Sequence, residues 1–452
     1  MSHFRTIDRA TPYLLPPSVD EWLPADHLAR FVVEVVDQLD LSALTGAYRG
    51  SGGSAAYHPA MLLALLMYGY STGTYSSRRI ERASYDSLAF RYIAANSHPD
   101  HDTLCAFRKR FTGEIESLFV QVLGIAKQMK LLKLGTLALD GTKVHANASR
   151  HSALSYGHAE KLEEQLRAEV QELLARAEAA DAEPLPEGLN IPEELSHRET
   201  RLQAIVEAKA QIEARAGERF AREQVEYEAK LKARADKQKR TGKKPGGKPP
   251  SPPTAGVGPR EQVNLTDAES RIMPAPGGGF EQSYNAQAAV DTDTMLVVAT
   301  GVTQATNDKQ QLVPMLKALA ELPAELGSVR ELLADAGYFS EANTDACVQA
   351  CIEPLLAPGR ESHHLPWQER FTEPATLDEP GDAVEQMKHR LKTRAGRARY
   401  RLRKQTVEPV FGIIKAVMGF RQFLLRGLEA VSAEWSMVTM AWNIRRMAVL
   451  RG

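Results

Sequence analysis

Residues 134–146 read LGTLALDGTKVHA, and here the chain changes its hydrophobic period. Apolar residues alternate in the manner of a β-strand, whereas residues 22–132 carry them at helical spacing. Asp140-Gly141 leaves two interpretations open, because Asp-Gly between apolar runs is also a strong hairpin signal. A single Asp at such a place is more often a turn residue than a ligand. The stretch predicts the first strand of an α/β domain that follows an all-α one.

A second apolar run, ELLADAGYFS at 331–340, predicts a buried strand that ends in Asp335. Working outward from these two runs, the predicted order is strand, large helical insertion, strand, strand, helix, strand, helix, strand and a final basic helix. Strands that alternate with helices in this way are typical of an α/β fold.

The basic helix comes from residues 388–415, KHRLKTRAGRARYRLRKQTVEPVFGIIK. Between Lys388 and Lys404 there are nine Lys or Arg residues and no acid, and then Glu408 stands alone. One interpretation is a solvated basic helix with a stray Glu. The other is a metal-binding carboxylate beside a track for a polyanion, where the basic side chains contact phosphates.

The length of the chain and the distribution of its charges bear on both interpretations. A chain of 452 residues is expected to form two or three domains. Its 56 Lys and Arg nearly balance 57 Asp and Glu, but the basic residues gather at 232–248 and 388–404 and the acidic ones at 159–213 and 369–385. The formal net charge of −1 therefore does not argue against a nucleic-acid partner.

The number of cysteines and the character of the N-terminal residues indicate the cellular compartment. Three cysteines cannot make a disulfide framework, which fits a reducing cytosol. The first residues carry no secretory signal, and no run of 18 apolar residues predicts a membrane span. We expect a cytoplasmic protein.

The N-terminal region predicts a helical domain that can bind DNA. A polar turn at 97–102 separates an upstream helix from a helix with Arg108, Lys109 and Arg110. This arrangement indicates a helix-turn-helix-like unit. The alternative is a plain helical bundle with a basic solvent face.

The long insertion is also mostly helical. Apolar stripes within charged flanks at 157–234 predict two helices in a coiled-coil-like hairpin, followed by a Lys-, Pro- and Gly-rich linker. The predicted domains are an extended arm at 1–22, a helical domain at 23–132, a catalytic core at 133–156 and 263–427, the helical insertion at 157–234, a flexible linker at 235–262 and a C-terminal helix at 428–452.

Three carboxylates then fall into a pattern. The runs LALD and LLAD each lead directly into an Asp, Asp140 and Asp335, and the late helix supplies Glu408. Carboxylates on adjacent strands and a facing helix are the ligands that Mg²⁺ needs for phosphoryl transfer. A competing acid, Asp308, is interpreted as a helix N-cap.

Six motifs in order carry a family resemblance: LALDGTKVHANAS, NLTDAESRIM, QSYNAQAAVD, NDKQQL, LLADAGYFS and VEPVFGIIK. They resemble the bacterial insertion-sequence transposases of the DDE class, most of all the insertion sequence eleven-eighty-two group. The resemblance implies a ribonuclease-H-like mixed-sheet core with Asp140, Asp335 and Glu408 as the catalytic triad. It also implies two Mg²⁺ or Mn²⁺ ions per active site.

The third block of that family follows the pattern Tyr-x2-Arg-x3-Glu-x6-Lys. Glu408 and Lys415 match it, whereas position 404 is Lys and Tyr400 lies one residue further back than the pattern requires. The resemblance implies that Lys404, Lys415 and Tyr400 contact DNA, and we place the neighbouring Arg403 with them.

The function that the resemblance implies is a transposase that binds the terminal inverted repeats as an oligomer, at least a dimer on paired ends. It would cut the ends and join them to target DNA in the bacterial cytoplasm, associated with the nucleoid. Two alternatives stay open: a metal-dependent nuclease that does not join, and a catalytically silent DNA-binding regulator. The intact triad argues against the second.

Overall fold

The computed structural model describes residues 18–48, 56–179, 190–242, 246–275, 277–359, 372–374 and 381–452. The chain divides into two compact units, one of Met1–His145 with Ser283–Gly452 and one of Ala146–Gln282. Most of the predicted N-terminal arm lies outside the described residues. Its last part is not extended as predicted, since Val19–Trp22 form a helical turn (α1), where the Ser18 hydroxyl accepts the Asp20 N–H.

The helical region of the first unit is built around one apolar helix. Its elements are α2 (Leu28–Val36), α3 (Ser42–Gly46), α4 (Pro59–Ser71), α5 (Ser77–Asp86), α6 (Leu88–Ile93), α7 (His101–Arg110) and α8 (Ile115–Gln128). Almost every side chain of α4 is buried, so this helix has neighbours on all sides. One neighbour is the C-terminal helix α16 (Leu428–Arg451), where the Ala441 carbonyl accepts a hydrogen bond from the Ser71 hydroxyl at 3.0 Å. The N-terminal helices and α16 thus share one core.

A buried polar network fastens this shared core. Glu434 on α16 has no exposed surface, and its carboxylate accepts the backbone N–H groups of Leu424 and Leu425 at 2.9 Å each. It also accepts the Tyr70 hydroxyl at 3.2 Å, and Arg108 of α7 donates to that same hydroxyl at 3.2 Å. Burial raises the pKa of Glu434, while the hydrogen bonds and the nearby Arg108 charge oppose that rise. This buried network of polar and charged side chains therefore connects helices α4, α7 and α16.

The other part of the first unit is a mixed sheet. Its strands run in the order β4-β5-β1-β7-β8, with β6 also paired to β5; β4 and the first three residues of β5 fall within the range Ala146–Gln282. Their bounds are Arg271–Pro274 (β4), Phe280–Asp291 (β5), Thr136–His145 (β1), Glu331–Ala334 (β7), Glu353–Leu356 (β8) and Val297–Thr303 (β6). Strand β1 pairs antiparallel with β5 and parallel with β7, and it continues straight through Asp140-Gly141. The hairpin alternative at that dipeptide is wrong, and the predicted mixed α/β class is confirmed.

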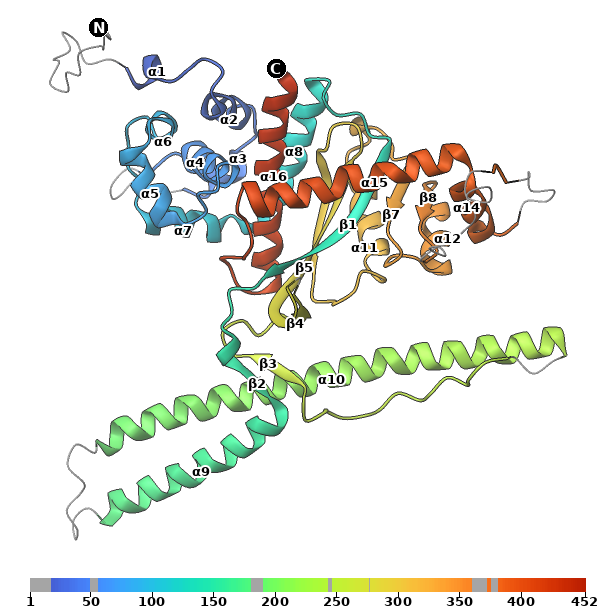
Figure 1. Ribbon diagram of the computed structural model, residues 1–452. Helices are drawn as coiled ribbons and strands as arrows, with labels where there is room; N and C mark the ends of the chain where they lie inside the picture. The colour runs from blue at the N-terminus through green and yellow to red at the C-terminus, as the bar shows by residue number, and fades with distance from the viewer. Residues whose placement is uncertain are drawn as a thin grey trace, which may run out of the picture. The chain divides into compact units, whose positions relative to one another are not determined.

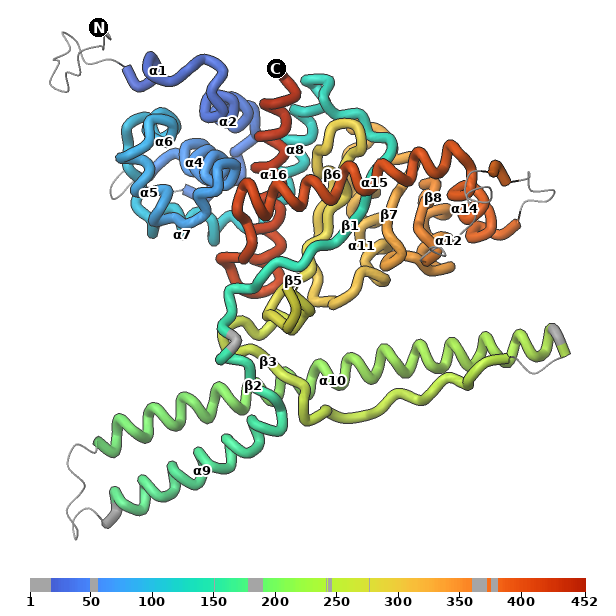
Figure 2. Tube along the Cα trace, in the orientation of Figure 1, coloured from blue at the N-terminus to red at the C-terminus, as the bar shows by residue number. Residues whose placement is uncertain are grey.

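Helices cover the sheet. The late helix α15 (Arg394–Gly412) packs on β1 and β7, and Figures 1 and 2 show it crossing these strands. It continues into a short π-helical turn, Ile413–Val417. The other helices are α11 (Leu312–Ala320), which packs on β6, and α12 (Glu341–Gln349) and α14 (Ala383–Lys392), which pack on β8.

The second unit consists of two long helices and a small sheet. Helix α9 (Tyr156–Ala179) packs along α10 (Ile191–Thr241), and β2 (Ala153–Ser155) pairs antiparallel with β3 (Gln262–Asn264). Helix α10 reaches beyond residue 234, where the linker was predicted to begin, because Lys and Arg favour helix as well as flexible chain. It ends at Gly242, a left-handed C-cap.

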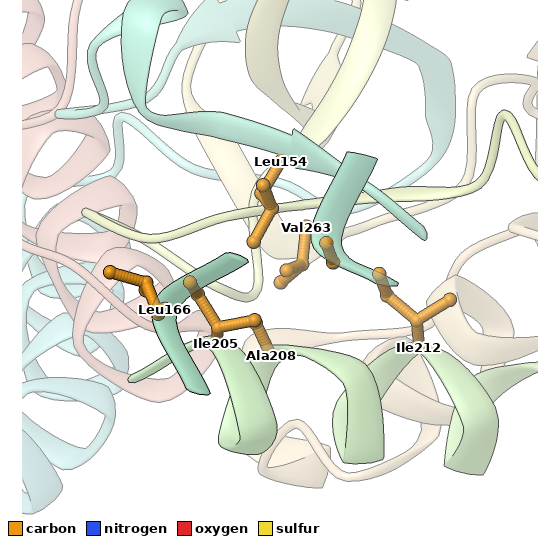
Figure 3. Close-up of a cluster of buried hydrophobic side chains, with 7 residues drawn as sticks. Leu154, Leu166, Ile205, Ala208, Ile212 and Val263 are labelled. Carbon is orange, nitrogen blue, oxygen red and sulfur yellow. The ribbon is translucent and has the colours of Figure 1, made fainter. Parts of the chain in front are cut away.

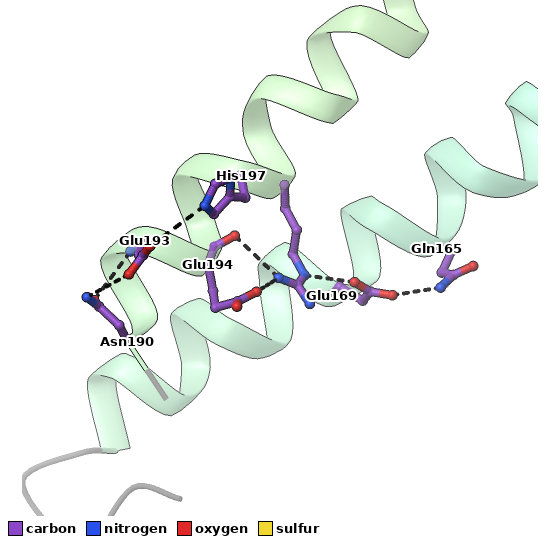
Figure 4. Close-up of polar contacts among 7 residues, drawn as sticks. Gln165, Glu169, Asn190, Glu193, Glu194 and His197 are labelled. Carbon is purple, nitrogen blue, oxygen red and sulfur yellow. Dashed lines mark hydrogen bonds and ion pairs between the residues drawn. The ribbon is translucent and has the colours of Figure 1, made fainter. Parts of the chain in front are cut away.

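Apolar contacts hold this unit together. A cluster of buried side chains from both helices and both short strands lies at its centre (Figure 3): Leu154, Ala159, Leu166, Ile205, Ala208, Ile212 and Val263. Ion pairs flank the cluster, as where Arg198 of α10 donates to Glu169 of α9 at 2.8 Å (Figure 4). Such partly exposed pairs contribute little to stability, so the apolar seam determines how the helices pack.

Among the described residues, no helix combines the length and the apolar character needed to cross a bilayer.

Replacing Glu434 by Ala tests the buried network. The substitution removes the acceptor of the Leu425 N–H and leaves the Arg108 charge without its buried counter-charge. We expect a loss of about 3–5 kcal/mol in the free energy of unfolding, measured by urea denaturation. Glu429→Ala, at an exposed position of the same helix, should change it by less than about 1 kcal/mol; equal losses in both variants would contradict this role for Glu434.

Candidate active site

Two aspartates lie next to each other because of the register between β1 and β7. In this parallel pair Leu139 is opposite Ala334, so the residues that follow, Asp140 and Asp335, are neighbours. Asp140 accepts the Gly141 N–H at 2.8 Å, and Asp335 accepts the Gly337 N–H at 2.8 Å. Burial, reinforced by the Asp335 charge, raises the pKa of Asp140 to about 7, although the Gly141 N–H and Arg403 oppose the rise. A negative charge is therefore costly at this position unless a cation accompanies it.

Helix α15 brings the third carboxylate to the same place. Its buried residues include Arg403, Val407 and Val410, spaced so that they form one stripe that faces the sheet. Arg403 donates from Nη1 to Asp140 Oδ2 at 3.3 Å and from Nη2 to Glu408 Oε1 at 3.1 Å. The side chain of Glu408 is 50% exposed, whereas that of Arg403 is 9% exposed. The structure thus connects Glu408 to Asp140 through a guanidinium group.

The arginine of the predicted third block is at a different position from the one expected. Lys404, which occupies the pattern's Arg position, is exposed, and its predecessor Arg403 points inward. Tyr400 is half-buried; burial raises its pKa, and Arg403 beside it lowers it. Tyr400 and Arg403 keep the Tyr-x2-Arg spacing, and Glu408 comes one residue late. That intact spacing was the sequence signal for Arg403.

Lys415 lies on the π-helical turn that follows α15. Its Nζ donates to the Thr142 hydroxyl at 2.6 Å and to the Lys143 carbonyl at 2.7 Å, so it ties this turn to β1. Burial, followed by the repulsion of Lys143, lowers the pKa of Lys415.

A fourth acid, Asp308, lies near the triad. Its interpretation as a helix N-cap is wrong, because α11 begins at Leu312 and is capped at Gln311. Instead Asp308 Oδ1 accepts the side-chain amides of Asn285 and Gln287 at 2.7 Å each. Its charge contributes to the raised pKa of Asp140. The sequence signal was the pair Asn285 and Gln287, two amides two residues apart on one face of a predicted strand, since buried amides need polar partners.

Gly141 makes room for this arrangement. A Cβ atom at position 141 would lie 2.2 Å from Gln287 Nε2 and 2.4 Å from Asp308 Oδ1. Any side chain here would push Asp308 and its two amide donors away from Asp140. Glycine is therefore required by close approach rather than by a turn.

The donor set fits a hard cation in its chemistry, since Asp140, Asp335, Asp308 and Glu408 offer only oxygen. Their present spacing is wider than one ion needs: among the described residues no three Asp, Glu, His or Cys side chains are grouped closely enough to hold a metal. Between Asp140 and Glu408 lies the Arg403 guanidinium, which contacts both carboxylates.

The predicted DNA contacts on α7 separate into two kinds. Arg108 is buried in the network with Tyr70 and Glu434, so its predicted contact with DNA does not fit its position. Lys109 and Arg110 are exposed. Arg110 donates to the Ala47 carbonyl at 2.6 Å and lies over the Tyr48 ring.

Two family models match the chain. The first, described as Transposase domain (DUF772), matches residues 17–110, and the second, Transposase DDE domain, matches residues 257–444. The second range includes Asp335 and Glu408, and Asp140 lies before it. Searches of curated proteins and of solved structures give no match.

The mixed sheet and the DDE model together define a DDE enzyme with a ribonuclease-H-like core. The chain belongs to the DDE transposases of insertion sequences, and as a DNA transposase it has DNA as its substrate. Its assignment to the insertion sequence eleven-eighty-two group stays a prediction.

Gly141→Ala tests whether activity depends on the close approach of Gln287 and Asp308 to Gly141. The added Cβ displaces Asp308 and Gln287, and displacements of about 1 Å near reacting groups lower rates on the order of 10²-fold. We expect a loss of that size in transposition frequency, with circular dichroism showing a folded protein. Gly113→Ala is the matched control, since a Cβ there meets nothing within 4 Å. Full activity in Gly141→Ala would show that the Asp308 arrangement is dispensable.

Proposed function

We propose that the protein binds the terminal inverted repeats of its insertion sequence, at least as a dimer on paired ends. With Mg²⁺ or Mn²⁺ it cuts the DNA there and joins the freed 3′-hydroxyl to target DNA. The observation that carries this proposal is the neighbouring pair Asp140 and Asp335, to which α15 adds Glu408.

Asp140, Asp335 and Glu408 are the residues that would hold divalent ions. When bound, two such ions supply Lewis-acid chemistry, namely an activated attacking oxygen and a stabilised leaving oxygen. The chain's own residues prepare the place. Partial burial of Asp140, whose side chain is 17% exposed, and the nearby charges of Asp335 and Asp308 make a cation the favourable partner.

The exposed face of α15 is suited to a DNA backbone. Arg401, Lys404 and Glu408 are all exposed and lie at i, i+3 and i+7, so they share one face of the helix. The two cationic side chains, Arg401 and Lys404, therefore lie on the same helix face as the carboxylate of Glu408. Phosphates that contact Arg401 and Lys404 would place the next part of the strand beside Glu408.

The triad itself is tested by Asp335→Asn and Glu408→Gln with a duplex that carries the element end and Mg²⁺. Removing a ligand of an ion that supplies several kcal/mol should lower cleavage and joining by more than about 10²-fold. End binding should persist in a mobility-shift assay. Asp345→Asn, an exposed acid on α12, is the control.

The same assay separates the alternatives. Nicked ends without joined products indicate a nuclease, and binding without chemistry in the unaltered protein indicates a silent regulator. Cleavage that survives Asp335→Asn and Glu408→Gln would remove these residues from the site.

The phosphate track is tested by the double substitution Arg401→Gln with Lys404→Gln. Each lost phosphate contact should lower the slope of log affinity against log salt by about 1, so the double variant should lose about 2. Fluorescence anisotropy at several salt concentrations measures it. Lys317→Gln, with a side chain 78% exposed on α11, should leave the slope unchanged; an unchanged slope in the double variant would place the DNA elsewhere.

A further inference from the structure

The guanidinium group of Arg403 occupies the space between two residues that the proposed function assigns to metal binding. Its Nη1 contacts Asp140 and its Nη2 contacts Glu408, at 3.3 and 3.1 Å. Its Nε is buried and has no hydrogen-bond partner among the described residues. This side chain is therefore held by two carboxylates at its tip.

A guanidinium and a metal ion compete for such a place. Arg stays protonated in proteins, so Arg403 keeps its charge and cannot become a neutral neighbour of an incoming cation. An ion that binds Asp140 Oδ2 and Glu408 Oε1 takes over the lone pairs that Arg403 now uses, and at any position between the two carboxylates it repels the guanidinium at short range. Metal binding therefore requires Arg403 to leave.

A buried guanidinium does not leave without another partner, because an unpaired charge in a buried place is strongly unfavourable. DNA offers that partner. Phosphate oxygens match the fork of a guanidinium as well as a carboxylate does. The exposed Arg401 and Lys404 flank this part of α15 and would hold a phosphate backbone within its reach.

We infer that Arg403 is a positioning residue that makes metal binding depend on DNA. Without DNA, Arg403 bridges Asp140 and Glu408 and lowers the affinity of the site for a divalent ion. When DNA is bound, a phosphate pairs with the guanidinium, and both carboxylates become available to bind a divalent ion. This inference rests on the proposed function, and it implies by reciprocity that metal raises the affinity for DNA by the same factor.

The test measures equilibrium Mn²⁺ binding to the full-length protein, with free Mn²⁺ followed by electron paramagnetic resonance. Each protein is titrated alone and with a pre-cut element-end duplex that has a 3′-dideoxy terminus, so that no chemistry occurs. In the unaltered protein we expect the duplex to raise Mn²⁺ affinity by at least about fivefold.

Arg403→Gln should bind Mn²⁺ at least about fivefold more tightly than the unaltered protein without DNA, and the duplex should add little. Arg403→Lys keeps the charge but lacks the planar fork with two separate Nη groups, so it should be intermediate. It also serves if the Gln variant does not fold. Arg399→Gln is the matched control, since Arg399 lies on the same helix and pairs with Glu331.

Equal Mn²⁺ affinity in Arg403→Gln, Arg403→Lys and the unaltered protein, with the same response to DNA, would overturn the inference. The proposed function fails in a different way. If Asp335→Asn leaves Mn²⁺ binding unchanged in every condition, or if no protein binds Mn²⁺ with or without DNA, the metal site itself is wrong.

Discussion

The mixed sheet of the first unit depends on the pairing of strand β1 with β5 on one side and with β7 on the other. Leu137, Ala138 and Leu139 are completely buried, so a shift of the strand that moved Asp140 into the place of Leu139 would bury a charge. The parallel register with β7 sets Asp140 beside Asp335. The antiparallel register with β5 sets Gly141 opposite Gln287, whose amide holds Asp308. One strand thus fixes the position of three acids.

The same register explains how the core accommodates a large insertion. The β1–β5 ladder ends with His145 opposite Ser283, and the second unit, Ala146–Gln282, lies between them in the sequence. The chain therefore leaves the ladder and returns to it at paired positions. An insertion at the end of a hairpin changes no strand order and no register, and the entropy of closing a longer loop grows slowly with its length. The inserted residues include β4 at the edge of the sheet, and the pairing of β1 with β5 and β7 stays unchanged.

Much of this arrangement could be predicted from the sequence, and the failures share a cause. The order of strands and helices along the chain and the two aspartates follow from period and spacing, which are local properties. Asp335 follows its strand as predicted, whereas Asp140 lies within β1 rather than at its end. Which side of a helix faces the core depends on what packs against it. Arg108 was assigned to DNA as a member of a basic run, yet it is buried in the core that α4 and α16 share. On α15, Arg403 rather than Lys404 faces the sheet. Asp308 was missed because its amide partners are distant in sequence.

Charge balance then explains why an arginine belongs in the centre of an acidic site. Asp140, Asp335 and Asp308 lie close enough that each of the other two raises the pKa of Asp140. Lys143 and Lys415 are half-buried nearby, but burial lowers the pKa of both, and Lys415 donates to β1 rather than to the acids. Arg403 alone among these three cations contacts Asp140 and Glu408 directly. A site assembled from several carboxylates needs positive charge before any substrate arrives, and the Arg403 guanidinium supplies that charge in the absence of DNA. The sheet determines where the carboxylates lie, and α15 supplies Arg403, whose positive charge offsets their mutual repulsion.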